Sequence, residues 1–386
     1  MPGSSLDDAA GPLGELHLVL IWHNALDQAE RILADVEEHF TVSDVLRIHW
    51  SPRRFSRDLT SFYHTDLPPG SEKERHCGVG EFLLLVVEDR DPVYAVRRVS
   101  QGRQFVNTKM HAAKERYREW SGGGHRIHTT LDQPEFERDS FLLLGPRAQH
   151  YRVGASDSWD RKITDLFVDV VGMGGWDDRK QLLTATELNT PSVVMEHSEG
   201  GKLTLLTEDL WLVSVAASGL APEKQEFARY DLTIGGNPQT VELHEVGGGH
   251  LDPDWQSDMI ERRVWETEGL PVLSPEDRFY SLLYRGLHHE PGLLEACAPE
   301  LRALAVEYDL PDGDFGDTRL AQDNLMSYLA RMGYGHGFRR PPPVPPKPSL
   351  VERSRRAVGR TPVGSLKRTL HASGTELFRR LRRISP

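Results

Sequence analysis

The sequence predicts an α+β protein with two folded domains and a basic C-terminal tail. Its 386 residues are long enough for two domains plus appendages. In residues 148–305, strand-like runs such as Ser192–Met195 alternate with helical segments such as Pro275–Leu287, which favours an α/β or α+β domain. A proline-rich run at 341–350 then separates the folded body from the basic segment 351–386.

The start of the chain and the cysteine usage indicate a cytoplasmic protein. Residues 1–14 are predicted to be a disordered leader, because they lack the basic start and apolar core of a secretory signal. Cys77 and Cys297 are the two cysteines, so no disulfide framework is implied. No apolar run reaches the roughly 18–20 residues that a bilayer-spanning helix needs.

The most informative segment is Gly-Gly-His-Arg-Ile-His-Thr-Thr at 123–130. A neutral imidazole such as that of His128 is a nucleophile at neutral pH without prior activation. The upstream Arg98 and the basic segment 114–118 offer guanidinium groups, which bind phosphate bidentately. This segment therefore indicates phosphoryl transfer, with a polar loop of helix-capping histidines as the alternative.

Several segments between Trp22 and Asp139 follow one another with the spacing of a known domain. They are the strand Leu16–Ile21 followed by Trp-His-Asn-Ala-Leu, the Tyr-bearing Ser61–His64, the buried strand Phe82–Val87, an expected short helix at Val93–Gly102, and His-Arg-Ile-His-Thr-Thr-Leu-Asp at 125–132. In this order they match an I-K-P-D-A start and an N-x-x-H-G-S-D-S motif. Residues 15–147 therefore resemble a divergent nucleoside diphosphate kinase domain.

The resemblance implies a ferredoxin-like βαββαβ domain that carries a phosphohistidine. By that resemblance His128 is the nucleophile, Asp139 orients its ring, and Thr130 matches the Ser of the H-G-S motif. The residues expected to contact the nucleotide or its phosphates are Arg98, Arg116 or Arg118, Phe62 or Tyr63, and His125.

Three departures from the family pattern leave the substrate open. Trp22 stands where the family has a phosphate-binding Lys, His125 replaces Asn, and Leu131 replaces Asp. The preferred function is a nucleotide-dependent phosphotransferase that uses a nucleoside tri- or diphosphate with Mg²⁺. The alternatives are a transferase acting on surface-polymer precursors with its chemistry in the second domain, and a non-catalytic nucleotide-binding module at the membrane. Because members of the resembled family usually form oligomers, a homo-oligomer is expected.

The second domain, 148–305, resembles nucleotidyltransferase-fold domains more weakly. Clustered carboxylates at strand ends hold Mg²⁺ against phosphates, and Glu208, Asp209 and Glu242 are the candidates here, against the alternative of a structural domain with acidic turns. Further elements are expected in this second domain: strands at Leu203–Leu206, Leu210–Val215, Tyr230–Ile234 and Thr240–His244, and a helix at Pro222–Ala228. A helical closing segment is expected at 306–340.

The charge of the chain is divided between its body and its tail. Residues 341–386 contain eleven Lys and Arg and two Glu, a net +9, while the whole chain carries −12. Apolar residues at helical spacing and a basic polar face predict an amphipathic helix in 351–386 on an anionic membrane surface. The alternatives are a disordered tail or one that folds back on the acidic body. Nucleic acid is not expected, because Phe378 is the tail's single aromatic residue.

Overall fold

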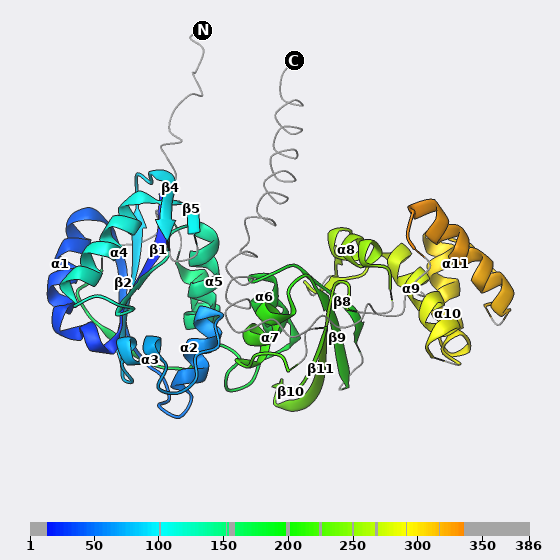
Figure 1. The fold of residues 1–386 in the computed structure, drawn as a ribbon, viewed down its shortest axis with the longest axis horizontal. Coiled ribbons are helices and arrows are strands. Elements are labelled where there is room, and N and C mark those ends of the chain that lie inside the picture. The colour runs from blue at the N-terminus through cyan, green and yellow to red at the C-terminus, as the bar shows by residue number, and fades with distance from the viewer. Residues whose placement is uncertain are drawn as a thin grey trace, which may run out of the picture. The chain divides into compact units, whose positions relative to one another are not determined.

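The structure is a computed structural model that describes residues 14–335, except 100–101, 152, 154–158, 198–200, 224–225, 249–250, 267–268, 291 and 316. Helices and mixed sheets alternate along the chain (Figure 1), so the predicted α+β class is confirmed. Contacts divide the described residues into the hairpin Val93–Thr108 and a larger unit that contains all other elements.

The first sheet of the larger unit has the order β6-β1-β3-β2-β7. Neighbouring strands are antiparallel, except that β7 runs parallel to β2. Because β7 belongs to this sheet, the first body extends beyond the boundary predicted at residue 147. The strands are β1 (Glu15–Ile21), β2 (Thr41–His49), β3 (Phe82–Asp89), β6 (Ile127–Thr129) and β7 (Thr164–Phe167).

Both faces of this sheet are covered, and β3 is buried along its whole length. Figure 1 shows α1 and α4 on one side of the sheet and α2 and α5 on the other. The core on the α2–α5 side joins Leu18 and Leu20 of β1 to Phe62 and Leu142. The helical segments are η1 (His23–Gln28), α1 (Ala29–His39), α2 (Phe55–Tyr63), α3 (Glu72–Cys77), α4 (Thr108–Trp120), α5 (Gln133–Leu144) and η2 (Gly145–His150).

The second sheet has the order β10-β11-β9-β8-β13-β12 and mixes parallel and antiparallel pairs. The predicted strands near 192, 203, 230 and 240 are confirmed as β8 to β11. The strands and the two adjacent helices are α6 (Arg179–Glu187), β8 (Ser192–His197), β9 (Lys202–Thr207), α7 (Leu210–Ser218), β10 (Phe227–Ile234), β11 (Asn237–Glu245), β12 (Val264–Trp265) and β13 (Pro271–Val272).

Two predicted elements of this region are wrong. Leu210–Val215 is not a strand but the start of α7, which Asp209 caps by accepting a hydrogen bond from the Leu212 N–H and which ends at Gly219 in the left-handed region. A short, mostly apolar run fits a buried helix as well as a strand, and here the two caps decide. The described residues of Pro222–Ala228 are not helical, and β10 begins at Phe227.

The remaining helices share one core. Buried side chains such as Trp255, Phe279, Leu301, Phe315 and Leu325 pack together, so the helices on both sides of residue 305 form one cluster. The predicted helix at Pro275–Leu287 is confirmed. The helices are α8 (Pro253–Glu261), α9 (Pro275–His288), α10 (Leu293–Glu307) and α11 (Thr318–Met332).

The hairpin unit consists of β4 (Tyr94–Val99) and β5 (Gly102–Asn107) in antiparallel register. The short helix expected at Val93–Gly102 is therefore wrong. Three valines stiffen this segment at χ1 and suit a pleated strand. Gly102, with φ of +114°, accommodates the return of the chain into β5.

The leader and the tail lie outside the described residues. The structure therefore does not describe the predicted leader up to residue 13, the proline-rich linker at 341–350 or the amphipathic helix in 351–386. Over the part of the chain that it describes, no helix has both the length and the apolar character needed to cross a bilayer.

A buried carboxyl group fastens the segment after β7 to α2. Asp58 is fully buried, and its Oδ1 accepts a hydrogen bond of 3.1 Å from the Val170 N–H. Its Oδ2 has no partner among the described residues. Burial, reinforced by the nearby Asp169, raises the pKa of Asp58 from 3.8 to about 8. The native state therefore holds a proton on Asp58 at neutral pH.

We expect Asp58→Asn to remove a pH dependence of stability. Because the folded pKa lies above the unfolded one, the native state binds the extra proton between about pH 4 and pH 8. Stability should fall as pH rises through that window, by up to about 1.4 kcal/mol per pH unit. Urea unfolding at pH 5 and pH 8 should show Asp58→Asn gaining stability over wild type as pH rises. The exposed control Asp323→Asn should follow wild type, and parallel profiles for Asp58→Asn and wild type would contradict this account.

Candidate functional site

His128 lies on the edge strand β6, directly opposite Leu20 of β1. The chain reaches β6 from α4 through Gly122, Gly123 and Gly124, whose φ values of +85°, +82° and +74° favour glycine. The predicted Gly-opened turn therefore delivers the imidazole to the α2–α5 side of the sheet. His128 retains 6% of its surface exposed.

A buried carboxylate orients the imidazole of His128. Its Nε2 lies 2.8 Å from Oδ2 of Asp139, which is fully buried on α5. The other carboxylate oxygen, Oδ1, accepts hydrogen bonds of 2.9 and 2.7 Å from the Arg138 guanidinium. Helix α5 is positioned by its N-cap, where Asp132 accepts a bond from the Glu135 N–H. The structure thus brings His128 and Asp139 together as the sequence predicts.

This geometry fixes the tautomer of His128. Burial would raise the pKa of Asp139, but Arg138 and the bond from His128 outweigh burial and hold that pKa below its usual value. An ionised carboxylate only accepts hydrogen bonds, so Nε2 of His128 carries the proton. Burial also lowers the pKa of His128. The ring is therefore neutral at pH 7, and Nδ1, which has no hydrogen-bond partner among the described residues, keeps its lone pair.

Two aromatic rings of α2 flank His128. Phe62 and Tyr63 meet it edge-on, with ring centroids 5.2 and 5.7 Å away. The Tyr63 hydroxyl accepts a hydrogen bond of 3.0 Å from Trp22 Nε1. Trp22 itself is fully buried and packs against Trp50, with ring centroids 5.4 Å apart. Trp22 therefore belongs to the core and fixes Tyr63, rather than lining an open site.

Two cations of α4 reach the outer edge of β6. Lys114 donates to the Thr129 carbonyl at 3.2 Å, and Arg118 donates to the Ile127 carbonyl at 3.3 Å. These carbonyls flank His128 in sequence. Residues four apart share a helix face, so the intervening Arg116 points elsewhere and pairs with Asp35 at 2.9 Å. Of the two predicted arginines, Arg118 is thus the one beside the strand of His128.

Lys73 of α3 is a third cation at this site. Its Nζ lies 3.6 Å from the centroid of the Tyr63 ring. Burial is the largest cause that lowers its pKa to about 8, and Lys114 and Arg118 lower it further. Among the described residues Lys73 has no hydrogen-bonding or ion-pairing partner. A cation–π contact contributes about 0.5–2 kcal/mol, whereas desolvating an unpaired ammonium costs several kcal/mol.

His125 borders the same cations. Burial lowers its pKa to about 4, and the nearby Lys73 and Arg118 contribute to that shift. Its ring lies 5.6 Å from that of His76, and its carbonyl accepts a bond from the Cys77 thiol. At pH 7 His125 is a neutral side chain that can donate one hydrogen bond to a ligand.

The structure also describes Thr130 and Arg98, each within its own unit. The Thr130 hydroxyl is fully buried and accepts a 2.9 Å bond from the Leu18 N–H, so it ties β6 to β1. Arg98 lies on β4 of the hairpin unit, where it is exposed opposite Arg103.

The carboxylates predicted to hold metal in the second domain are not brought together. Asp209 caps α7, with Glu208 exposed beside it. Glu242 lies on β11 in register with Thr204, and it pairs with Lys202 at 2.6 Å. The groups of three metal-ligating side chains found among the described residues include none of these.

One such group does surround His128, with Glu135 and Asp139. Its carboxylates already have partners, because Arg138 binds Asp139 and the Glu135 side chain accepts a 2.6 Å bond from the Leu131 N–H. Lys114 lies close enough to lower the pKa of His128. A resident metal ion would be repelled by these two cations, so the cluster fits poorly as a metal site.

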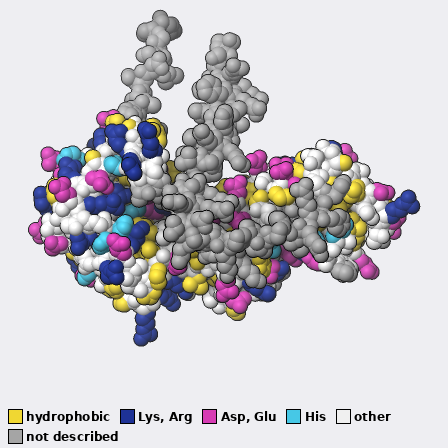
Figure 2. Space-filling view, viewed as in Figure 1, with side chains coloured by type: hydrophobic (Ala, Val, Ile, Leu, Met, Phe, Trp, Pro, Cys, Tyr) yellow, Lys and Arg dark blue, Asp and Glu magenta, His cyan; other side chains and the backbone are white. Residues whose placement is uncertain are grey.

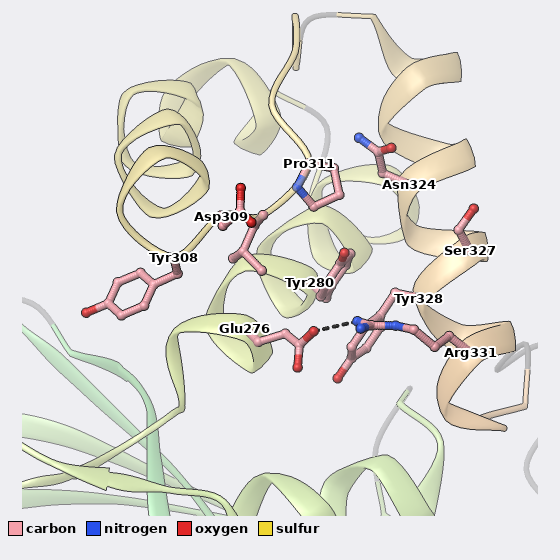
Figure 3. Close-up of a pocket in the computed structure, with 10 residues that line it drawn as sticks. Glu276, Tyr280, Tyr308, Asp309, Pro311, Asn324, Ser327, Tyr328 and Arg331 are labelled. Carbon is pink, nitrogen blue, oxygen red and sulfur yellow. Dashed lines mark hydrogen bonds and ion pairs between the residues drawn. The ribbon is translucent and has the colours of Figure 1, made fainter.

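A hollow of about 500 Å³ lies among α9, α11 and the segment after α10. Figure 3 shows Tyr280, Tyr308 and Asn324 around it, with Glu276 joined to Arg331. Because the Arg331 guanidinium in this pocket is already paired with Glu276, the pocket offers a phosphate no unpaired cation among its lining residues.

Charges of both signs are spread over the described surface that Figure 2 shows around α1 and α4. No family model matches this chain, and a comparison with curated proteins finds no match either. The function must therefore be inferred from the geometry around His128.

We expect His128 to be the neutral Nε2–H tautomer at pH 8, since its pKa lies below the ordinary value of 6.5. Nitrogen-15 chemical shifts of the imidazole report tautomer and charge directly, and His128→Gln would assign the signals. In Asp139→Asn the tautomer preference should weaken and the pKa of His128 should fall further, because the carboxylate that favours the protonated ring is gone. A predominant Nδ1–H form in wild type would contradict the geometry.

Proposed function

We propose that this protein is a nucleotide-dependent phosphotransferase that carries the transferred phosphoryl group on His128. The observation that carries the proposal is the buried bond from His128 Nε2 to Asp139, which leaves Nδ1 as a nucleophile within a cluster of cations. A lone pair held at a fixed position next to cations is what attack on phosphorus requires.

The topology supports the same proposal. The strands β1, β2, β3 and β6 are antiparallel in the order β6-β1-β3-β2, with helices between β1 and β2 and between β3 and β6. This strand order supports the ferredoxin-like domain that the nucleoside diphosphate kinase resemblance predicts, with α2 and α3 added between β2 and β3. The additional β7 extends it at the edge farthest from His128.

In the proposed reaction, Nδ1 of His128 attacks the terminal phosphorus of a nucleoside triphosphate. The N–P bond forms as the bond to the bridging oxygen breaks, and the electron pair leaves with the nucleoside diphosphate. Asp139 accepts the Nε2–H bond throughout and stabilises the positive charge on the phosphorylated ring. An acceptor then attacks the same phosphorus in the reverse sense.

The residues around His128 have distinct roles in this proposal. Arg118 and Lys114 stabilise phosphoryl charge, and His125 donates a hydrogen bond to the ligand. Mg²⁺ would be supplied with the nucleotide and would neutralise phosphate charge, because Asp139 and Glu135 already have partners. Arg98 of the hairpin unit and homo-oligomer assembly remain expectations from the resemblance.

We expect transfer of label from γ-labelled ATP or GTP, with Mg²⁺, to give an acid-labile phosphohistidine on His128. His128→Gln should abolish this label, and Asp139→Asn should slow its formation by at least about tenfold, because the ring loses its orientation. His39→Gln, an exposed histidine on α1, should label as wild type does. Arg118→Gln should lose more label than Arg116→Gln, since Arg118 lies beside β6.

Other outcomes select another function. Nucleotide binding without any label would favour the non-catalytic nucleotide-binding module. Label that persists in His128→Gln and is stable in acid would place the chemistry elsewhere, with the second domain as the next candidate.

A further inference from the structure

Two lysines near His128, Lys73 and Lys114, form no ion pair among the described residues. The two arginines are paired, Arg138 with Asp139 and Arg118 with Glu115 at 3.4 Å. Lys114 donates to the Thr129 carbonyl of β6, which holds the ammonium without neutralising it. Lys73 has no partner at all among the described residues other than the face of Tyr63.

These cations come from different elements and converge. Lys73 belongs to α3, while Lys114 and Arg118 belong to α4. Lys73 lies on the ring of Tyr63, which also contacts His128. Lys114 and Arg118 donate to the carbonyls on either side of His128 in sequence, and both lower the pKa of Lys73, in agreement with this placement. The chain as a whole carries −12, so this local concentration of cations stands out. An anion bound between these cations would neutralise their charge and stabilise them.

We propose that Lys73 binds an oxygen of the phosphoryl group presented to His128, and that it supplies the cation which the family pattern places at Trp22. The inference rests on the proposed function for its choice of substrate, a phosphoanhydride such as a nucleoside triphosphate. Trp22 and Lys73 act on the same ring: Trp22 Nε1 donates to the Tyr63 hydroxyl, and Lys73 lies over the face. The Tyr63 ring thus holds the relocated ammonium in a defined position.

The alternative is that Lys73 only anchors α3 to α2 through Tyr63. The two roles differ in what removal of the charge does. An anchoring lysine would leave anion binding unchanged when replaced, whereas an anion-binding lysine would weaken it without loss of the fold.

The test is binding of tripolyphosphate to the full chain, measured by calorimetry in parallel with ATP, ADP and inorganic phosphate. Wild type should bind tripolyphosphate, and Lys73→Gln should weaken it by about 10- to 100-fold, the loss of one charge-assisted hydrogen bond. Lys180→Gln, an exposed lysine on α6, removes the same charge and should bind as wild type. Equal affinity for ATP and tripolyphosphate would show that the phosphates alone are recognised.

A second measurement uses the wild-type chain, so it does not depend on how Lys73→Gln folds. With a pKa of about 8, the Lys73 amine should react with an acetylating reagent at pH 8. Tripolyphosphate should protect Lys73 from acetylation, read by mass spectrometry, and should leave Lys180 reactive. The inference would be overturned if Lys73→Gln did not weaken tripolyphosphate binding. It would also be overturned if tripolyphosphate did not slow acetylation of Lys73 in the wild-type chain.

These results are separable from those for His128. Phosphohistidine that forms equally in wild type and Lys73→Gln would overturn the role of Lys73 and leave the proposed function standing. Lys73-dependent tripolyphosphate binding without any phosphohistidine would do the reverse.

Discussion

The buried chain from His128 through Asp139 to Arg138 is the constraint on which the rest of the site depends. A carboxylate that is fully buried must be paired, and here one oxygen accepts from the imidazole and the other from the guanidinium. If Arg138 were absent, burial would favour protonated Asp139, and a protonated carboxyl would not select the Nε2–H tautomer. The tautomer of His128, and with it the free lone pair on Nδ1, is thus determined by Asp139 and Arg138 of helix α5, which the cap at Asp132 positions.

The edge position of β6 explains why cations gather beside His128. An edge strand leaves its outward carbonyls without a strand partner, and Lys114 and Arg118 satisfy two of them. These contacts complete the fold and also hold two positive charges at the carbonyls on either side of His128 in sequence. Structural and chemical roles coincide in these side chains, so their effects on stability and on phosphate binding need separate measurement.

The features that the sequence predicts well are those in which one segment determines its own geometry. The glycine-opened segment at 123–130 is recognised from neighbouring residues, and the pairing of His128 with Asp139 is an expectation from the kinase resemblance. The strand of His128 and the cap at Asp132 are found only in the structure. Lys73 could not be found in this way, because its importance comes from Tyr63, Lys114 and Arg118, which belong to other elements. Helix α7 is missed for a different reason: its mostly apolar run is compatible with a strand, and the caps at Asp209 and Gly219 decide for the helix. The separation of Glu242 from Asp209 depends on strand register, which their residue types do not encode.

By the nucleoside diphosphate kinase resemblance Trp22 stands at a lysine position, and in the structure this position lies in the core. A lysine at this position would lie in a fully buried environment beside Trp50 and Phe82, where desolvation strongly disfavours its charge. An indole suits that environment and still provides one donor, which it uses to hold the Tyr63 hydroxyl. Once Tyr63 is fixed, its ring face can support an ammonium group that arrives from α3 instead of from the end of β1. In this arrangement Trp22 fixes the Tyr63 hydroxyl from within the core, and Lys73 packs on the face of the same ring.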